Sequence, residues 1–277
     1  MQTQFIIGVK IQKVIDALER FAPLPLQEGF DNAGLQVGLT EVEISGALLC
    51  LDVTEAIVDE AVSKGCNLIV AHHPLIFHKL ACISDHDYVQ RTVYKAIREG
   101  ITIVAMHTNM DNAEGGVNFK MAEKMGLQNL QSLQGPVVDG KWSGVIGTLP
   151  KPMEAQEYLE MLKREFLVHP AGQDVGCRNY VQANELLQRP IKRVALCGGG
   201  GAFMLDDALH NGADAFVTGE MHYHEFFGHD QQLQIAVIGH YESEQYTSEV
   251  FRDIIHRDCP GVPTFIAETN TNPIYWF

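Results

Sequence analysis

The sequence has few basic residues for its size. Lys and Arg number 20 against 35 Asp and Glu, which gives the 277-residue chain a formal net charge of −15. A surface this negative repels phosphate backbones unless basic residues are strongly clustered. We therefore do not expect a nucleic-acid partner. The 12 histidines of this acidic chain point to a different kind of chemistry.

The sequence also contains no long hydrophobic run, and its first residues do not have the pattern of a secretory leader. Apolar stretches such as residues 47–51 are far shorter than the ~20 residues that span a bilayer. Residues 1–9 show no basic segment that leads into an apolar segment and a small-residue cleavage site, so we expect no secretory signal. The sequence predicts a cytoplasmic protein with no membrane partner.

Two common binding motifs are incomplete. The six cysteines form no C-x-x-C pair, and most of them lie in apolar surroundings, as reduced core cysteines do, so we expect no thiolate zinc site. The run Gly198–Gly201 has Phe203 where a dinucleotide fingerprint needs a third glycine, and no Lys-Ser/Thr pair follows it. This run is either a phosphate cradle at a helix start or a tight turn.

What is present is an alternation of strand and helix patterns. A length about twice the ~150 residues of a typical domain, with 46% hydrophobic residues, allows two globular α/β halves with sizeable cores. Strands that alternate with helices predict mostly parallel sheets flanked by helices. The predicted helices are 10–21, 55–64, 87–98, 116–125, 153–166, 203–211, 222–231 and 243–255, and the predicted strands are 44–53, 67–71, 101–106, 142–149, 192–197, 213–217, 234–238 and 263–267.

The two halves of the chain resemble each other. Matching Cys50 with Cys197 aligns further identities at the same spacing, and matching residues 103–107 with 236–240 aligns His107 with His240. The further identities are Asp59 with Asp206, Ala61 with Ala208, Gly65 with Gly212, and Val70 with Val217. We expect a first half at 1–127, a connecting segment and the start of the second half at 128–190, a second half at 191–277, and a metal site between the two halves.

Four polar clusters follow apolar strands, where open α/β sheets place their sites. Imidazole together with carboxylate suits Zn, Fe, Mn, Co or Ni, whereas Ca and Mg prefer oxygen ligands alone. Any single cluster is more often a structural histidine or a helix-face pair than a ligand. Four clusters at equivalent strand ends favour a metal site. They are His72 with His73, His107 with Asp111, Glu220 with His222 and His224, and His240 with Glu244.

The cluster geometry allows more than one ion. Adjacent histidines that leave a strand point to opposite sides, so His72 and His73 can serve two ions. Two metals ~3.5–4 Å apart need a bridging carboxylate, and Asp111 and Glu244 offer one from each half. The cluster at 220–224 fits an outer position that supports the ligands.

At these residues the chain resembles a known family. Residues 30–38 resemble its signature W-D-N-x-G-L-x-V-G, with Phe30 in place of Trp. Residues 71–75, 107–111, 198–201, 218–220 and 239–244 follow in that family's order, over nearly the whole chain. The chain is therefore similar to the Nif-three-like (YbgI-type) family, whose members are often named GTP cyclohydrolase I type 2.

This resemblance implies a dinuclear centre, two related α/β domains without the extra domain of longer members, and a toroidal homohexamer. Glu220 stands where an Asp is common in the family, and neither this change nor Phe30 touches the ligands. The implied metal ligands are His72, His73, Asp111, His240 and Glu244.

The expected chemistry is metal-assisted hydrolysis, with His107 or Glu220 as the catalytic proton shuttle. For GTP, water would attack the imidazole ring and formate would leave. Two ions of about +4 total charge would make a local anion pocket, so a nucleotide or another anionic small molecule remains a possible partner. The alternatives are a hydrolase of phosphoesters or cyclic amides and a non-catalytic, ring-shaped metal-binding or interaction protein.

Overall fold

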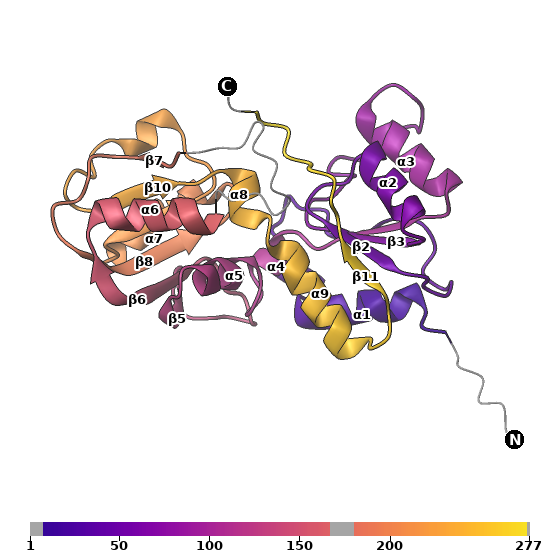
Figure 1. Ribbon diagram of the computed structural model, residues 1–277, viewed down its shortest axis with the longest axis horizontal. Coiled ribbons are helices and arrows are strands. Elements are labelled where there is room, and N and C mark those ends of the chain that lie inside the picture. Colours follow the sequence, from indigo (N-terminus) through magenta and orange to yellow (C-terminus); the bar gives the residue numbers. More distant parts are fainter. Residues whose placement is uncertain (1–7, 167–179, 276–277) are drawn as a thin grey trace, which may run out of the picture. The chain divides into compact units, whose positions relative to one another are not determined.

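The computed structural model describes residues 8–166 and 180–275 (Figure 1). Contacts divide the chain into two units. Within the described residues, the first unit takes those up to Met110 together with Thr247–Thr271, and the second takes Asp111–Tyr246 and the residues from Asn272 onward. Each unit has its own β-sheet flanked by helices, so the predicted α/β class is confirmed.

The sheet of the first unit has the strand order β1-β4-β3-β2-β11. The four strands β4, β3, β2 and β11 are parallel, and β1 is antiparallel at the edge. Every residue of β2, β3 and β4 is buried, as expected for strands covered on both faces. The bounds are β1 (Gly34–Val37), β2 (Ala47–Cys50), β3 (Leu68–Ala71), β4 (Thr102–Ala105) and β11 (Thr264–Ile266).

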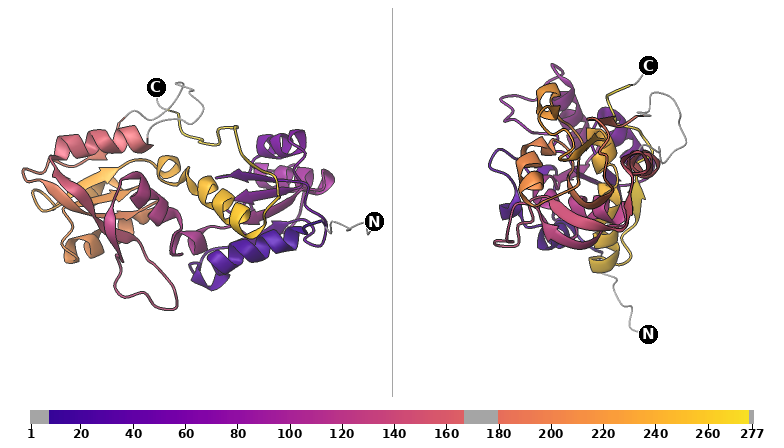
Figure 2. Two further views of the ribbon diagram at one scale, coloured as in Figure 1. Left: turned by 60° about the horizontal axis from the view of Figure 1, so that its bottom comes forward. Right: turned by 90° about the vertical axis from the view of Figure 1, so that its left-hand side faces the viewer.

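Two pairs of helices cover this sheet. Figures 1 and 2 show α2 (Glu55–Ser63) and α3 (Tyr88–Arg98) on one side, and α1 (Ile11–Phe21) and α9 (Thr247–Asp258) on the other. The helix starts follow from the sequence, because the side chains of Thr54 and Asp87 accept hydrogen bonds from the backbone N–H of Ile57 and Gln90. Such caps satisfy N–H groups that have no partner within the helix.

The sheet of the second unit has the order β5-β6-β8-β9-β10-β7. Only β8, β9 and β10 are parallel, and β5, β6 and β7 pair in the antiparallel sense. This sheet therefore contains more antiparallel pairing than the predicted, mostly parallel sheet. The bounds are β5 (Gln128–Ser132), β6 (Val145–Met153), β7 (Gln182–Ala183), β8 (Ile191–Cys197), β9 (Ala215–Thr218) and β10 (Gln234–Val237).

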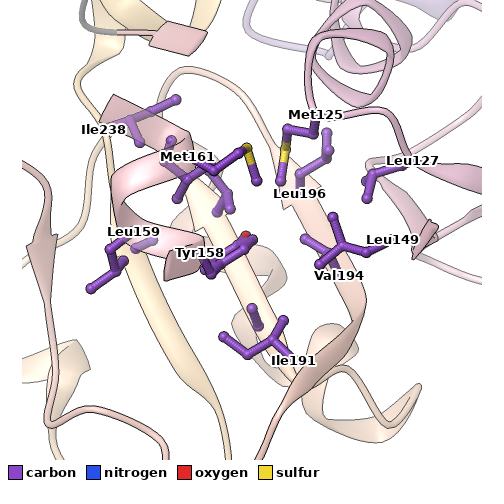
Figure 3. Packing of buried hydrophobic residues seen from close by; sticks show 14 of the residues in the cluster. Met125, Leu127, Leu149, Tyr158, Leu159, Met161, Ile191, Val194, Leu196 and Ile238 are labelled. Atoms are coloured by element: carbon purple, nitrogen blue, oxygen red, sulfur yellow. The ribbon is translucent and has the colours of Figure 1, made fainter. Parts of the chain in front are cut away.

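Helices α5 (Val117–Lys124) and α6 (Ala155–Phe166) pack on one face of the second sheet, and α7 (Leu205–His210) packs on the other. Figure 3 shows side chains of α6, such as Tyr158 and Met161, over Val194 and Leu196 of β8. These residues are buried or nearly so, and the cluster also includes residues of β6, β9 and β10. The second unit thus has its own hydrophobic core.

The internal repeat is visible in the strand register. Leu49 pairs with Val70 in the first sheet, and Leu196 pairs with Val217 in the second, as the sequence match requires. In the third strand, however, Val70 pairs with Val104, whereas Val217 pairs with Ala236 rather than with Val237. The sequence match is therefore one residue out of register at this strand, so His107 corresponds to Gly239 and not to His240.

Several predicted elements differ from the structure. The predicted helix at 222–231 is wrong, because this segment forms only the 3₁₀ turn η3 (Tyr223–Phe226) and continues into Gly228 and Gln231 with positive φ angles of 83° and 57°. The helix predicted at 243–255 is two helices, α8 (His240–Glu244) and α9. The short strands β1, β5 and β7 were not predicted, because each is short and partly exposed.

The segment Thr247–Thr271 returns to the first unit. We expected residues 191–277 to form the second half, but β11 pairs with β2, and α9 belongs with them. As limits of independently folding domains, 1–127, 128–190 and 191–277 stay a prediction. No helix within the described residues is long and apolar enough to cross a membrane. Cys50, Cys66, Cys197 and Cys259 are buried thiols, Cys82 is exposed, and Cys177 lies outside the described residues.

Candidate metal centre

Three histidines meet at one edge of the first sheet. His72 and His73 follow β3, and His107 follows the neighbouring parallel strand β4. The ring centroids of His72 and His73 lie 4.9 Å apart, and those of His107 lie 5.3 and 5.4 Å from them. One ligand nitrogen from each ring lies within 4.8 Å of the others. The first unit alone therefore gathers three imidazoles that can hold a metal ion, and His107, which we expected as a catalytic group, is one of them.

Each of these rings has its Nδ1 atom beside an oxygen acceptor. Because the acceptors are a carbonyl and two carboxylates, each Nδ1 carries the proton and donates it, which leaves Nε2 with its lone pair. Histidines that bind metals are oriented in this way by outer partners. The residues present therefore fit a metal ion. The Nδ1 distances are 2.9 Å from His72 to Met106 O, 2.7 Å from His73 to Asp52 Oδ1, and 2.7 Å from His107 to Asp31 Oδ1.

Asp31 belongs to the candidate site, but it was not among the residues that the sequence singled out. Its side chain is fully buried, and it accepts hydrogen bonds from His107 Nδ1 and from both the backbone N–H and the hydroxyl of Thr108. Burial alone would raise the pKa of Asp31, but the hydrogen bonds from His107 and Thr108 lower it to about 2. Asp31 is thus an ionised anchor for His107 at neutral pH.

Asp52 is the second residue that was missed. It accepts hydrogen bonds from His73 Nδ1 and, at 3.0 Å, from the hydroxyl of Thr271. Asp52 comes shortly after the buried strand β2, so the rule that drew attention to His72 and His107 could have found it.

In the second unit, His240 lies between two carboxylates. It begins α8 directly after β10, its Nε2 lies 3.1 Å from Glu244 Oε2, and its Nδ1 lies 3.2 Å from Glu220 Oε1. Glu244 is only 4% exposed, whereas Glu220 is exposed. His240 and the buried Glu244 can therefore act as a pair of metal ligands. The exposed Glu220 can orient the imidazole of His240 from its other nitrogen.

The glycine run at 198–201 fits closely around this site. Gly199 has a φ of 56°, and a Cβ atom there would overlap Oε1 of Glu244. The backbone N–H groups of Gly198 and Gly199 donate at 2.9 Å to Asn118 Oδ1 and Ser243 Oγ. Because protein acceptors already hold these two N–H groups, the structure favours the tight turn over the phosphate cradle.

The remaining predicted residues occupy different positions. Asp111 ends the short helix α4 (Thr108–Asp111) and is half-buried, and its backbone oxygen accepts a bond of 3.1 Å from Asn118. His222 and His224 lie exposed in and before η3, and neither belongs to a metal-binding group among the described residues. Of the 220–224 cluster, which we expected to support the metal ligands from outside, Glu220 is the residue that contacts a proposed ligand, His240.

Comparison with known proteins gives the family. A protein of Clostridium perfringens named GTP cyclohydrolase 1 type 2 homolog is 34% identical over 238 residues, which are 85% of this chain and 87% of that protein. A protein of the same name from Lactococcus lactis is 32% identical over 271 residues, 96% of this chain and 99% of that one. The crystal structure of a Staphylococcus aureus hypothetical protein matches with a TM-score of 0.85 and 25% identity over 98% of this chain and 100% of that chain. The model of the Duf34/NIF3 (NGG1p interacting factor 3) family matches residues 9–273, and the chain therefore belongs to this family.

Proposed function

We propose that this protein is a metal-dependent hydrolase that binds two divalent cations through His72, His73, Asp111, His240 and Glu244. The observation that carries the proposal is that His72 and His73 lie together with their Nδ1 atoms engaged by oxygen acceptors, as in histidines that bind metals, and that His107 lies beside them with its Nδ1 held in the same way. The buried pair of His240 and Glu244 supports it, because imidazole with carboxylate is the donor set of Zn, Fe, Mn, Co and Ni.

The reaction that we propose is hydrolysis of the imidazole ring of GTP. The names of the curated relatives support this choice of substrate. When bound, the cations supply a water of lowered pKa and polarise the electrophilic carbon. One water adds to the ring carbon between the two nitrogens and opens the ring by cleaving one C–N bond, which leaves a formamide. A second water hydrolyses the formamide to formate, so both ring nitrogens become amino groups and no redox change occurs.

Two side chains have the geometry to move or hold a proton in this reaction. Asp31 fixes the Nδ1–H of His107, so the Nε2 atom of His107 can accept a proton, and the buried carboxylate stabilises the imidazolium that results. Glu220 orients His240 through its Nδ1 atom and is exposed to the pocket beside it. We assign the shuttle to His107 and an orienting part in catalysis to Glu220.

The assembly and the charge belong to the same proposal. We propose that the 30.8 kDa chain forms a homohexameric ring in the cytoplasm, and analytical ultracentrifugation would measure the mass of this assembly.

Two bound cations would offset the charge of Asp111 and Glu244 inside a chain of net charge −15, so an anionic nucleotide can bind there. Because the net negative charge opposes its approach, binding should depend on ionic strength.

The test measures metal content and formate release together. Metal-loaded protein should release formate from GTP, and Glu244→Ala should abolish release and lower metal content. Asp253→Ala, at an exposed carboxylate on α9, is the matched control and should change neither. Full metal occupancy without formate would contradict the GTP reaction. A screen with phosphodiesters and cyclic amides would then distinguish another hydrolase from a non-catalytic metal-binding or interaction protein.

A further inference from the structure

A pocket of about 540 Å³ opens in the second unit beside His240. Its size lies in the range of small-molecule sites. The residues that line it include Phe203, Glu220, His240, Tyr241, Glu242 and Asn272. Since His240 lines the pocket and contacts Glu244, a ligand in the pocket would lie next to residues that we propose as metal ligands.

The charge of the pocket decides which end of a nucleotide can enter. Three carboxylates line it, those of Glu220, Glu225 and Glu242, and no Lys or Arg does so among the described residues. Carboxylates repel phosphate groups and accept hydrogen bonds from N–H groups. The pocket therefore favours a ring that carries several N–H donors, and the phosphates of a nucleotide must remain outside it.

Glu242 is the carboxylate best placed to recognise such a ring. It is only 8% exposed, lines the pocket, and accepts a hydrogen bond of 3.4 Å from Asn272 Nδ2. Asn272 is itself buried, and its Oδ1 accepts the backbone N–H of Ile274 at 3.1 Å. A carboxylate can accept about four hydrogen bonds, so Glu242 can hold Asn272 and a ligand together.

The base chemistry then follows from donors and acceptors. Guanine presents two parallel donors on one edge, the ring N1–H and the 2-amino group, and these match the two oxygens of a carboxylate. Hypoxanthine keeps N1–H but has no 2-amino group. Adenine has an acceptor at N1, which a carboxylate repels. Glu242 can therefore distinguish guanine from both other purines.

Phe203 supplies a surface for the face of the ring. Its side chain is 67% exposed although it lines the pocket. A planar base that stacks on this ring would bury apolar surface without selecting among bases, because every base has a π-face. Stacking by Phe203 and hydrogen bonding by Glu242 are thus separable contributions.

We propose that this pocket binds the guanine ring of the substrate, with Glu242 as the residue that determines specificity and Phe203 as the stacking platform. This inference rests on the proposed function for the identity of the substrate. It adds which part of the nucleotide enters the second unit and which side chain recognises it.

The experiment is calorimetric binding of guanosine, inosine and adenosine to the metal-loaded full-length protein. Guanosine should bind at least about tenfold more tightly than inosine, because inosine lacks one hydrogen bond to a charged acceptor. Glu242→Gln should weaken guanosine binding by about tenfold or more and reduce the preference over inosine. Phe203→Ala should weaken guanosine and inosine by similar factors.

Controls separate a local effect from misfolding and from failure of the proposed reaction. Glu160→Gln, at an exposed carboxylate on α6 of the same unit, should leave guanosine binding unchanged, and circular dichroism should show that each variant is folded. Equal affinities for guanosine and inosine, or an unchanged preference in folded Glu242→Gln, would overturn the inference. Selective guanosine binding without formate release from GTP would support the pocket and contradict the proposed reaction. Formate release from GTP and ITP at equal rates in both wild type and Glu242→Gln would support the reaction and overturn the pocket.

Discussion

The Nδ1 atom of His73 lies 2.7 Å from Oδ1 of Asp52, and the other oxygen of this carboxylate accepts a 3.0 Å hydrogen bond from the hydroxyl of Thr271. Asp52 thus joins a histidine after β3 to the segment that follows β11 within the same unit. This relationship orients the imidazole of His73 through its Nδ1 atom, as outer carboxylates orient the histidines that bind metals.

Replacing Asp52 should weaken metal binding without removing a ligand. We expect Asp52→Asn to lower the metal affinity by about 10- to 100-fold, because a neutral amide orients the imidazole of His73 less firmly than a carboxylate. Titration with Zn²⁺ or Mn²⁺ measures the change. Asp59→Asn, at an exposed carboxylate on α2 that contacts Lys95, is the control and should bind metal normally. An unchanged affinity in Asp52→Asn would refute the orienting role.

A methyl group added at position 199 should disturb the proposed metal centre, whereas one added at position 200 should not. Gly199 has a positive φ, and a Cβ atom there would overlap Oε1 of Glu244. We expect Gly199→Ala to lose metal and to lower the free energy of unfolding by about 1 kcal/mol or more. Gly200→Ala meets no atom within 4 Å and has a φ of −80°, so it should keep both metal and stability. Elemental analysis and urea unfolding measure the two effects, and equal behaviour of the two variants would count against the geometry.

The carboxylate of Asp214 should contribute stability that depends on pH. Burial alone would raise its pKa, but hydrogen bonds from the backbone of Arg193, from the Arg189 side chain and from the backbone of Lys192 lower it below the usual value of 3.8. A lowered pKa in the folded state means that the stabilisation is present above about pH 4 and is lost as the pH falls through the folded value.

We therefore expect Asp214→Asn to lower the free energy of unfolding by about 1–3 kcal/mol at pH 7. The difference from the wild-type protein should shrink as the pH falls below about 4, because the carboxylate of the unfolded wild-type chain is protonated first and that of the folded protein follows at lower pH. Urea unfolding at several pH values measures this difference. A difference that stays constant down to pH 2 would disprove the electrostatic cause.

The hydroxyl of Tyr158 should be dispensable. Its oxygen is buried and has no hydrogen-bond partner among the described residues, and its ring packs in the core of the second unit (Figure 3). We expect Tyr158→Phe to raise the free energy of unfolding by about 1 kcal/mol, because it removes a buried polar atom that makes no bond. Tyr158→Ala should lower it by about 3–5 kcal/mol through loss of packing. A destabilised Tyr158→Phe variant would indicate that the hydroxyl has a structural partner.

Much of the fold follows from local sequence signals. The capping residues Thr54 and Asp87 begin helices where the sequence predicts them, because capping depends on atoms only three residues away. The buried strands β3 and β4 are also predicted, and so is the meeting of His72, His73 and His107 at their carboxyl ends. Parallel strands place their carboxyl ends at one edge, so this part of the candidate site is encoded in the order of the elements.

Other features depend on contacts that no local pattern contains. Asp31 reaches His107 across 76 positions of the chain, and Asp52 reaches His73 across 21, so the acceptors of both rings were missed. The helix expected at 222–231 is interrupted where Gly228 and Gln231 adopt positive φ angles, although its apolar spacing is helical. Periodicity reports which face of a segment is buried, and it does not report what the segment packs against.

The sequence by itself determined the α/β class, the repeated strand and helix units, and the histidines at the ends of β3 and β4, because these depend on apolar periodicity and on the geometry of parallel strands. The tertiary structure decided which oxygen holds each imidazole and that β11 joins the sheet of the first unit. It also decided that Glu242 and Asn272 meet in one pocket. These features require residues distant in the chain to be brought within hydrogen-bonding distance, and only the complete packing of the chain determines which of them meet.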